Sequence, residues 1–434
     1  MSVEINKVTV IGAGTMGAGI AALCATAGCQ VWLLDMKTEM ATASIERLSG
    51  GKRPVITQQQ AALITAGSLE DDFSTIADSD WICEAVVEDL KIKRDLFSRI
   101  EKVRSDGSVV TTNTSGIPLK DIVADMPERL RRDIAVTHFF NPVHIMKLVE
   151  LVPGADTQQQ VMDRLTNFLS GPLGKGVVHA KDTVNFIGNR IGCFWMLAGL
   201  HKAAKAQGIS METIDALMSR PVGLPPTGLY GLIDLIGLDV MDFVAKNLDK
   251  NLPADDIGRQ FLELPDTESV MLGNGQLGRK TGGGFYKLVK AEDGSKSMEV
   301  YDLQARQWRP MNAVELESAH QDIKTLVFAN DAEGKFSWDL MSSTLEYASS
   351  LVPEISNDIV NVDRAMAWGF NWALGPFKLI DAIGAQAFAE KLQSEGRELS
   401  GMLKVLIENG HSSFYRNDES EFLTVSGTYE KVQG

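Results

Sequence analysis

The chain has 434 residues, of which 44 % are hydrophobic and 23 % charged, and this composition at this length is typical of a globular protein with two or three domains. The formal net charge of -15 argues against general binding to nucleic acid or to anionic membranes. A few local cations and helix N-termini would still suffice for a phosphorylated cofactor.

Targeting signals and cysteine usage point to one compartment. No charged-then-apolar leader precedes the first predicted strand, no apolar run is long enough to span a bilayer, and the C-terminal KVQG is not a peroxisomal address. The four cysteines form no CxxC pair and lie in apolar runs: Cys24, Cys29, Cys83 and Cys193. We therefore expect buried free thiols and a cytoplasmic protein.

A glycine-rich loop joins the first predicted strand, residues 7–11, to a predicted helix. The loop reads Gly12-Ala13-Gly14-Thr15-Met16-Gly17, which is the G-x-G-x-x-G pattern in the strand–turn–helix context of dinucleotide sites. In that pattern Gly12 permits the tight turn, Gly14 lets the backbone approach a pyrophosphate, and Gly17 lets the helix pack on the strand. The residues expected to contact the cofactor here are Gly12, Gly14, Thr15, Met16 and Gly17.

An acidic residue, Asp35, ends the second predicted strand. Its carboxylate lies where it can accept hydrogen bonds from the ribose hydroxyls of NAD and repel the 2′-phosphate of NADP, so the pattern favours NAD.

The stretch 36–76 is harder to interpret. Within it, Lys52 and Arg53 are either ordinary solvated charges or contacts for a phosphorylated part of a substrate.

Strands and helices then alternate up to residue 140. Predicted strands cover 81–86, 109–112 and 134–140, and predicted helices cover 90–103 and 119–126. This alternation predicts a Rossmann-like, doubly wound, mostly parallel sheet, in which ligands collect at the carboxyl ends of the strands. Glu88, Ser115 and His138 each lie at or just past such an end.

His138 and Glu150 belong to two extended runs, AVTHFF and MKLVELV, that are separated by Asn-Pro. Pro142 disfavours a helical conformation of Asn141, so the chain must leave its first strand and return. The return can bring the imidazole and the carboxylate together, which fixes the tautomer and leaves one ring nitrogen free to take a proton. The alternative is that His138 caps a strand and Glu150 is a solvated charge. His144 is a competing imidazole without a strand-end position.

The middle of the chain reads as a helical domain. Residues 181–183 can cap a long helix that begins near Asn185 and ends before Gly208. Asn189, in the early turns of that helix, is either a satisfied core amide or a group that points into a cleft between domains. Further helices are predicted over 211–220 and 231–248, followed by a flexible basic loop over 278–286 and a hairpin over 287–308 that turns around residues 292–294.

The helical region contains an internal repeat. The segments 214–217 and 232–237 resemble 362–366 and 379–384, and GGGFYK is echoed by SSFYR. We interpret the repeat as a duplicated helical domain whose second copy has no active site and replaces a partner subunit in cis. The predicted domains are an NAD-binding domain over 1–183, a first helical domain over 184–287, a hairpin connector over 288–315 and a second helical domain over 316–434.

Six phrases occur in order over residues 5 to 287: VTVIGAGTMGAGIA, DWICEAVVEDLKIKRDLF, NTSG, THFFNPVHIMKLVE, KDTVNFIGNRIG and GRKTGGGFYK. Together they resemble the L-3-hydroxyacyl-CoA dehydrogenase family, and the duplicated helical half is similar to its long β-oxidation members. The resemblance implies a Rossmann-like sheet followed by two related all-α domains, with NAD as cofactor and no metal. It also implies oxidation of an L-3-hydroxyacyl-CoA thioester to the 3-ketoacyl-CoA in fatty-acid β-oxidation.

The resemblance also implies partners. Some long members of the family are fused to an enoyl-CoA hydratase, and some work with a thiolase. No hydratase-like segment is present in this sequence, so the chain is either a dehydrogenase-only protein or part of a longer polypeptide. A hydratase or thiolase partner is therefore expected.

The same resemblance assigns roles to residues. His138 would be the catalytic base and Glu150 its partner, Ser115 and Asn189 would contact the 3-oxygen of the substrate, and Asn141 would help to hold the reacting groups. The positions that match the cofactor side are Glu88, Lys93 and Lys280. The lysine-rich arm that short members place over coenzyme A is shortened and changed here, which leaves Lys52 and Arg53 as candidates and the acyl-chain preference open.

Two other functions compete with this one. A β-hydroxyacid or 6-phosphogluconate-type dehydrogenase also joins a Rossmann-like domain to a helical one, but uses a lysine base, and the corresponding helix position here is Asn189. A catalytically silent NAD-binding subunit that scaffolds a complex is the second alternative. The set of His138, Glu150, Ser115 and Asn189 argues against it.

Overall fold

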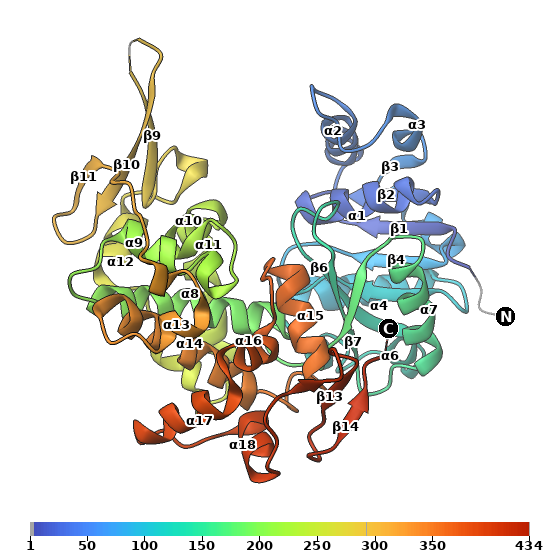
Figure 1. Ribbon diagram of the computed structural model, residues 1–434. Coiled ribbons are helices and arrows are strands. Elements are labelled where there is room, and N and C mark those ends of the chain that lie inside the picture. The colour runs from blue at the N-terminus through green and yellow to red at the C-terminus, as the bar shows by residue number, and fades with distance from the viewer. Residues whose placement is uncertain (1–3, 292, 434) are drawn as a thin grey trace. The chain divides into compact units, whose positions relative to one another are not determined.

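The computed structural model describes residues 4–291 and 293–433, in two units, one that ends at Phe186 and one that begins at Ile187 (Figure 1). The first unit is built on an eight-stranded sheet with the order β3-β2-β1-β4-β5-β6-β7-β8. Neighbouring strands in this sheet are parallel except for β6 and β7. The predicted Rossmann-like, mostly parallel sheet is confirmed.

The strands of the first unit are β1 (Lys7–Ile11), β2 (Gln30–Asp35), β3 (Ile64–Ser68), β4 (Trp81–Glu84), β5 (Val109–Thr112), β6 (Ile134–Phe139), β7 (Leu148–Pro153) and β8 (Gly176–His179). Its α-helices are α1 (Thr15–Thr26), α2 (Thr38–Ser49), α3 (Gln58–Ala61), α4 (Leu90–Val103), α5 (Leu119–Ile122), α6 (Glu128–Asp133) and α7 (Gln159–Ser170). The predicted bounds of β1, β5 and α4 are confirmed, whereas α5 ends four residues before the predicted 126.

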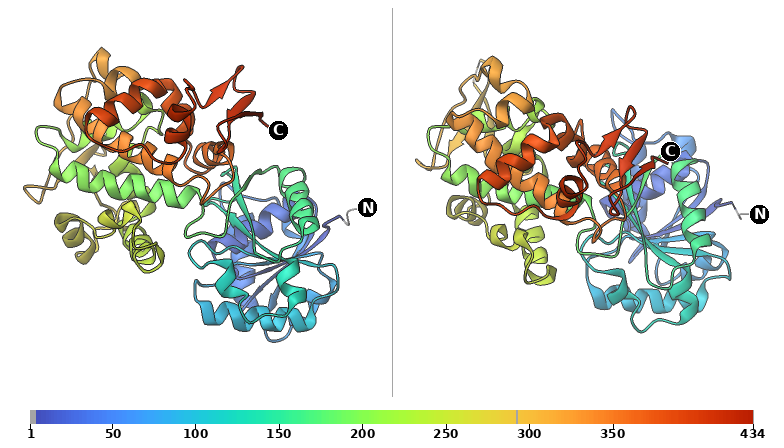
Figure 2. Two further views of the ribbon diagram at one scale, coloured as in Figure 1. Left: turned by 90° about the horizontal axis from the view of Figure 1, so that it is seen from below. Right: turned by 60° about the horizontal axis from the view of Figure 1, so that its bottom comes forward.

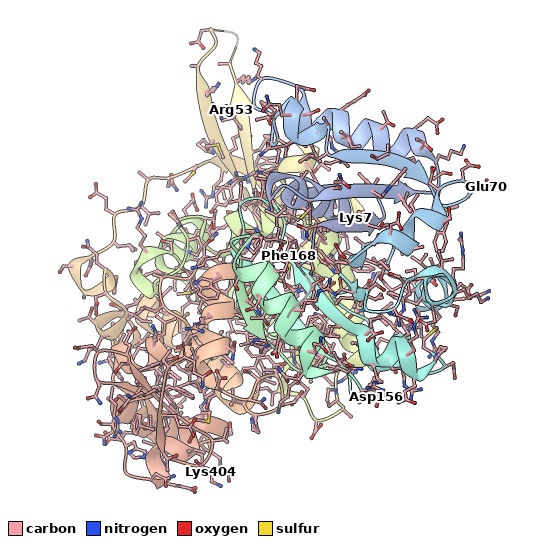
Figure 3. All side chains as sticks on the ribbon, turned by 90° about the vertical axis from the view of Figure 1, so that its right-hand side faces the viewer. Lys7, Arg53, Glu70, Asp156, Phe168 and Lys404 are labelled. Carbon is pink, nitrogen blue, oxygen red and sulfur yellow. The ribbon has the colours of Figure 1, made fainter. Side chains whose placement is uncertain are left out.

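One face of the sheet forms a core with α1 and α7. Val8 and Val10 of β1 belong to this buried cluster together with apolar side chains of both helices. Phe168, labelled in Figure 3, reaches from α7 to Trp81 of β4, and the two rings meet edge-on with centroids 5.7 Å apart. Alternate side chains of the strands are thus buried against these helices. The ends of the strands are not used in this packing and are available for the site.

The stretch 36–76, which the sequence left undefined, contains α2, α3 and the edge strand β3. The face that α2 turns to the core is narrow: Ala41 and Ser44 are buried, and only Ile45 and Leu48 add large apolar side chains, both partly buried against the core. The periodic signal of this helix is therefore weak. The strand β3 reads ITAGS, which is short and poor in large apolar residues. These two features explain why the pattern failed here.

The predicted cap of the long helix is wrong. The helix α8 (Gly188–Lys205) begins three residues later than predicted and has no side-chain cap at Ile187. Asp182 instead accepts hydrogen bonds from the backbone N–H groups of Leu119 and Lys120, at 2.7 and 2.8 Å, and so caps α5. A carboxylate at a helix N-terminus is favourable wherever it comes from along the chain, and sequence adjacency does not reveal this partner.

The second unit is mainly helical. Its α-helices after α8 are α9 (Met211–Leu217), α10 (Gly228–Ile236), α11 (Leu238–Asn251), α12 (Asp266–Gly273), α13 (Ile323–Val327), α14 (Ala332–Ser350), α15 (Ile359–Gly369), α16 (Pro376–Ile383), α17 (Ala385–Ser394) and α18 (Gly401–Glu408). The predicted helix over 211–220 ends at Leu217, and the one over 231–248 is two helices because Gly237 adopts a φ of 108°. Among the described residues, no helix is long and apolar enough to cross a membrane.

Two small antiparallel sheets accompany the helices of the second unit. The first consists of β9 (Tyr286–Lys290), β10 (Lys296–Asp302) and β11 (Gln307–Pro310), and the second of β12 (Tyr415–Arg416), β13 (Glu421–Leu423) and β14 (Tyr429–Lys431). The predicted hairpin corresponds to β9 and β10, but residue 292 of its predicted turn lies outside the described residues. The C-terminal sheet is a feature that the predicted all-α second copy leaves out.

Buried aspartates occupy matching places in the two copies of the repeat. Asp215 accepts hydrogen bonds from the first backbone N–H groups of α10, at Tyr230 and Gly231 (2.7 and 3.0 Å). Asp363 accepts the corresponding bonds at α16, from Phe377 and from the next residue (2.8 and 3.3 Å). A second pair repeats the correspondence, because Asp234 holds the N–H groups of Phe285-Tyr286 and Asp381 those of Phe414-Tyr415. Equivalent contacts of this kind are expected if one helical domain was duplicated to give the two copies.

The aspartates of the repeat give the second unit a predictable pH dependence. Burial raises the pKa of Asp215 and of Asp363 to about 7, well above the value of roughly 3.9 expected in the unfolded chain. The folded state therefore binds more protons than the unfolded state between these values, and stability falls as the pH rises through that window. We expect Asp363→Asn to reduce the difference in unfolding free energy between about pH 5 and about pH 7.5 by at least roughly 1.4 kcal/mol, the equivalent of one pKa unit.

Denaturant unfolding at a series of pH values measures this slope. The matched control is Asp255→Asn, because Asp255 is exposed, and this variant should keep the slope of the parent chain. An unchanged slope in Asp363→Asn would contradict the linkage.

Candidate active site

The glycine loop between β1 and α1 has the shape that a dinucleotide requires. At Gly12, where φ is +104°, a Cβ would lie 2.5 Å from the carbonyl oxygen of Ala85. At Gly17 a Cβ would lie 1.8 Å from the carbonyl oxygen of Gly12. At Gly14, by contrast, a Cβ would meet nothing within 4 Å, so the backbone borders open space. Two glycines are needed for packing, and the third lies where a pyrophosphate can approach the backbone.

The N-terminus of α1 and Asp35 complete this part of the site. The first turn of α1 contains no acidic residue and has no side-chain cap at Gly14, so its positive end is open to an anion. The Asp35 carboxylate accepts a hydrogen bond of 2.5 Å from the backbone N–H of Ala13, inside the loop. The acid predicted to contact a ribose thus lies against the predicted phosphate loop, and these residues fit a dinucleotide.

His138 and Glu150 lie opposite each other on β6 and β7. The antiparallel register pairs the two residues directly, and His138 Nδ1 lies 2.6 Å from Glu150 Oε2. Both residues are buried, and the imidazole packs against the rings of Phe140 and Phe186 with centroids 4.7 and 5.6 Å away. A carboxylate at this distance makes Nδ1 the protonated nitrogen, which leaves Nε2 to accept a proton.

A buried ion pair lies beneath the loop that presents Ser115. Lys93 on α4 is 1 % exposed, and its Nζ lies 2.7 Å from Glu84 Oε1 and 3.3 Å from Glu88 Oε2. Glu88 in turn accepts hydrogen bonds from the N–H groups of Ser115 and Gly116, at 3.0 and 2.8 Å. The pKa of Glu88 is lowered despite its burial, because the Lys93 ammonium and these hydrogen bonds favour the carboxylate.

Lys93 and Glu88, both predicted to contact the cofactor, have protein partners in this network. The Lys93 ammonium meets two carboxylates, and Glu88 supports the backbone of the half-buried Ser115. A direct contact of either residue with the cofactor stays a prediction. The network joins β4, α4 and the loop after β5, so a disturbance at Lys93 is expected to reach Ser115.

Replacing Lys93 with methionine is expected to destabilise the first unit by about 3–5 kcal/mol, because the fully buried Glu84 carboxylate would lose its counter-charge. The double variant Glu84→Gln/Lys93→Met should recover most of the loss, since the fully buried charge at position 84 is removed. The Glu88 carboxylate also loses its cation, but it is 23 % exposed and keeps its hydrogen bonds from Ser115 and Gly116. Lys91→Met, at an exposed position of the same helix, is the matched control and should have little effect. Chemical denaturation of the full chain measures these differences. Equal stability of Lys93→Met and Lys91→Met would contradict this account.

Two residues to which the sequence analysis assigned no role, Asn113 of the phrase NTSG and Lys175, hold the surroundings of His138. The side-chain oxygen of Asn113 accepts a hydrogen bond of 2.9 Å from the backbone N–H of Phe139. The buried Lys175 donates to the carbonyl oxygens of Val143 and Met146, which fixes the turn between β6 and β7. Both contacts join residues that are more than twenty positions apart, and no local sequence signal identifies them.

The other predicted residues lie at several places. Asn141 and His144 are exposed in the β6–β7 turn, and neither is part of the buried imidazole–carboxylate pair. Lys52 and Arg53 are exposed between α2 and α3. Lys280 forms an ion pair of 2.5 Å with Asp239 in the second unit, and Asn189 is half-buried in the first turn of α8. Their functional roles stay predictions.

Comparison with known proteins identifies both units. A family model described as "3-hydroxyacyl-CoA dehydrogenase, NAD binding domain" matches residues 7–183, and one described as "3-hydroxyacyl-CoA dehydrogenase, C-terminal domain" matches residues 186–288. The human mitochondrial hydroxyacyl-coenzyme A dehydrogenase is 34 % identical over 65 % of this chain and 91 % of its own length. The crystal structure of 3-hydroxybutyryl-CoA dehydrogenase from Escherichia coli has 26 % identity and a TM-score of 0.72, and the match covers 94 % of this chain and 100 % of that one.

Longer relatives are also similar. A putative fatty acid oxidation complex trifunctional enzyme of Rickettsia prowazekii is 36 % identical over 88 % of this chain and 53 % of its own length. The chain spans little more than half the length of several such relatives. The two family models together cover well over half of the chain, and the crystal structure matches nearly all of it. The chain therefore belongs to the 3-hydroxyacyl-CoA dehydrogenase family, and its first unit is the NAD-binding domain of that family.

Proposed function

We propose that the chain oxidises L-3-hydroxyacyl-CoA thioesters to 3-ketoacyl-CoA with NAD⁺ as the hydride acceptor, in fatty-acid β-oxidation. The observation that carries this proposal is the buried contact of 2.6 Å between His138 and Glu150 at the carboxyl end of β6. It occurs in the same sheet as a dinucleotide loop. Ligands of such folds collect at that edge of the sheet, and the base therefore lies where a ligand is expected.

The proposed role of His138 follows from the chemistry of the alcohol. A secondary alcohol is a very weak acid, so its proton must leave as the C3 hydride leaves and the carbonyl bond forms. His138 accepts that proton at Nε2, and general-base assistance of this kind typically contributes about 10²–10⁴-fold. Glu150 holds the ring through Nδ1 and stabilises the imidazolium as it forms. NAD⁺, when bound, supplies the hydride acceptor.

The remaining predicted residues complete the proposal. Ser115 and Asn189 donate hydrogen bonds to the 3-oxygen as it becomes a carbonyl, and Asn141 helps to hold the reacting groups. Glu88, Lys93 and Lys280 act on the cofactor side, and Lys52 with Arg53 meets the phosphates of coenzyme A. The Ser115 role is supported by the fixed loop that Glu88 maintains.

An assay of the reverse reaction tests the proposed function. Acetoacetyl-CoA with NADH should give rapid NADH oxidation, whereas NADPH and a free 3-hydroxy or 3-keto acid should be poor substrates. NADH binding without turnover of any thioester would favour the silent scaffold subunit. Activity confined to free acids would favour the β-hydroxyacid dehydrogenase.

Partners and location are part of the same proposal. The similarity to a trifunctional fatty acid oxidation enzyme supports an enoyl-CoA hydratase or a thiolase as the partner, in the same polypeptide or as a separate protein. The four cysteines are free and buried, which supports work in a reducing compartment such as the cytoplasm. We also propose the predicted domains over 1–183, 184–287, 288–315 and 316–434, with the second helical copy in place of a partner subunit. Co-purification from cell extract would test for a separate partner.

A further inference from the structure

The first turns of α8 are held from outside the helix. Asn189 lies in the first turn, and Ile187 provides no side-chain cap for the four N–H groups at that end. The residues after Asn189 are nevertheless almost completely buried, and Arg190 is 1 % exposed. The contacts that bury this segment decide where Asn189 is held.

Arg190 is bound by a tyrosine of the second copy. Its Nε donates a hydrogen bond of 2.5 Å to the hydroxyl of Tyr347 on α14, and its Nη2 pairs with the carboxylate of Asp256. The Tyr347 hydroxyl also lies 3.1 Å from both carboxylate oxygens of Asp256, so it accepts from the guanidinium and donates to the acid. A second carboxylate, that of Glu354, lies 3.5 Å from Nη2. A guanidinium this deeply buried requires such partners.

Aromatic rings of the second copy cover the next positions of α8, and α8 lies beside α14 (Figure 2). The ring of Phe194 stacks on that of Tyr347 with centroids 4.1 Å apart and an angle of 22°. A Cβ at Gly192 would lie 2.2 Å from the ring of Phe370, so this ring packs directly on the helix backbone. Glycine at position 192 is thus explained by a residue of the second copy.

We infer that the second helical copy positions Asn189, with Tyr347 and Phe370 as the positioning residues, so that the copy contributes to turnover without an active site of its own. The inference rests on the proposed function, in which Asn189 contacts the 3-oxygen. Groups that polarise a reacting oxygen must be held within about 0.5 Å of their working position, and a displacement of about 1 Å can lower turnover roughly 10²-fold. The Arg190–Tyr347 bond joins the residue next to Asn189 to α14 and supplies that restraint.

The test is a double-mutant cycle. Tyr347→Phe removes the hydroxyl but keeps the ring, and it is expected to lower kcat about tenfold or more while the KM for NADH stays unchanged. In an Asn189→Ala background the same change should lower kcat by less than about twofold, because the restrained group is absent. A merely structural role would lower kcat equally in both backgrounds. Tyr429→Phe is the matched control, because its hydroxyl donates to the carbonyl of Ser413 in the C-terminal sheet.

A second variant keeps the inference falsifiable if Tyr347→Phe does not fold. Phe370→Leu removes the ring that packs on Gly192, and it should give the same non-additive loss of kcat with Asn189→Ala. Additive losses, or an unchanged kcat in Tyr347→Phe and Phe370→Leu, would overturn the inference while leaving the proposed function intact. A normal kcat in Asn189→Ala itself would instead overturn the proposed role of Asn189, and this inference with it.

Discussion

Replacing His138 with glutamine is expected to lower kcat for the oxidation of a 3-hydroxyacyl-CoA by at least about 10²-fold. Glutamine fills a similar volume and can still contact Glu150, but it has no nitrogen that accepts a proton near neutral pH. The affinity for NADH should stay within about threefold of the parent value, because His138 lies on β6 and the glycine loop lies between β1 and α1. The expected pattern is therefore a loss of turnover without a loss of cofactor binding.

Steady-state kinetics with NADH titration measures the His138→Gln effect. His144→Gln is the matched control, because His144 is exposed in the β6–β7 turn and is not bonded to Glu150. It should keep nearly normal turnover. Turnover of His138→Gln equal to that of His144→Gln would reject the assignment of the base.

Replacing Glu150 with glutamine is expected to have the second-largest effect, a fall in kcat of about 10²–10⁴-fold. The carboxylate is fully buried, and its bond of 2.6 Å to His138 Nδ1 fixes which ring nitrogen carries the proton. A neutral amide can donate as well as accept, so it permits the wrong tautomer, and it cannot stabilise the imidazolium. Because the amide has nearly the same volume, the fold should be preserved.

Three measurements separate this effect from a loss of structure. The circular dichroism spectrum and the NADH affinity of Glu150→Gln should match those of the parent chain, while kcat falls. Glu128→Gln is the control, since Glu128 is exposed on α6. If Glu150→Gln turned over as fast as Glu128→Gln, the carboxylate would have no part in the chemistry.

Local patterns predicted most of the first unit and the centre of its site. The glycine loop is encoded in consecutive residues, and each glycine has the geometric reason that the pattern implies. The pairing of His138 with Glu150 could be predicted because Pro142 interrupts two extended runs of suitable length. When a strand reverses beside its neighbour, the register follows from the turn, and the register places the two side chains together.

Contacts between distant residues could not be predicted in this way. Asp182 caps a helix 63 positions earlier, and Arg190 binds a tyrosine 157 positions later. A carboxylate or a guanidinium carries no signal of which partner it will meet, because such contacts depend on how the elements pack. The helix α2 was missed for a different reason, since its inward face carries only Ala41, Ser44, Ile45 and Leu48, which is too narrow and too little apolar to give a clear periodic signal.

The internal repeat could be predicted from the sequence only in part. Its sequence similarity is faint, yet Asp215 and Asp363 make the same backbone contacts at the starts of α10 and α16. A buried carboxylate that holds two N–H groups is costly to lose, which explains why these aspartates mark the repeat while the surrounding residues differ. The rings of Tyr347 and Phe370, which pack on α8, are the basis for the proposed role of the second copy in positioning Asn189. The sequence of the second copy alone does not suggest this role.

Single-turnover oxidation of NADH by acetoacetyl-CoA, with protein in excess over NADH, tests the central claim most directly. The account predicts that NADH absorbance decays in one rapid phase in the parent chain, and at least about 10²-fold more slowly in both His138→Gln and Glu150→Gln. A decay of unchanged rate in either variant would contradict it, because the imidazole–carboxylate pair would then not move the proton.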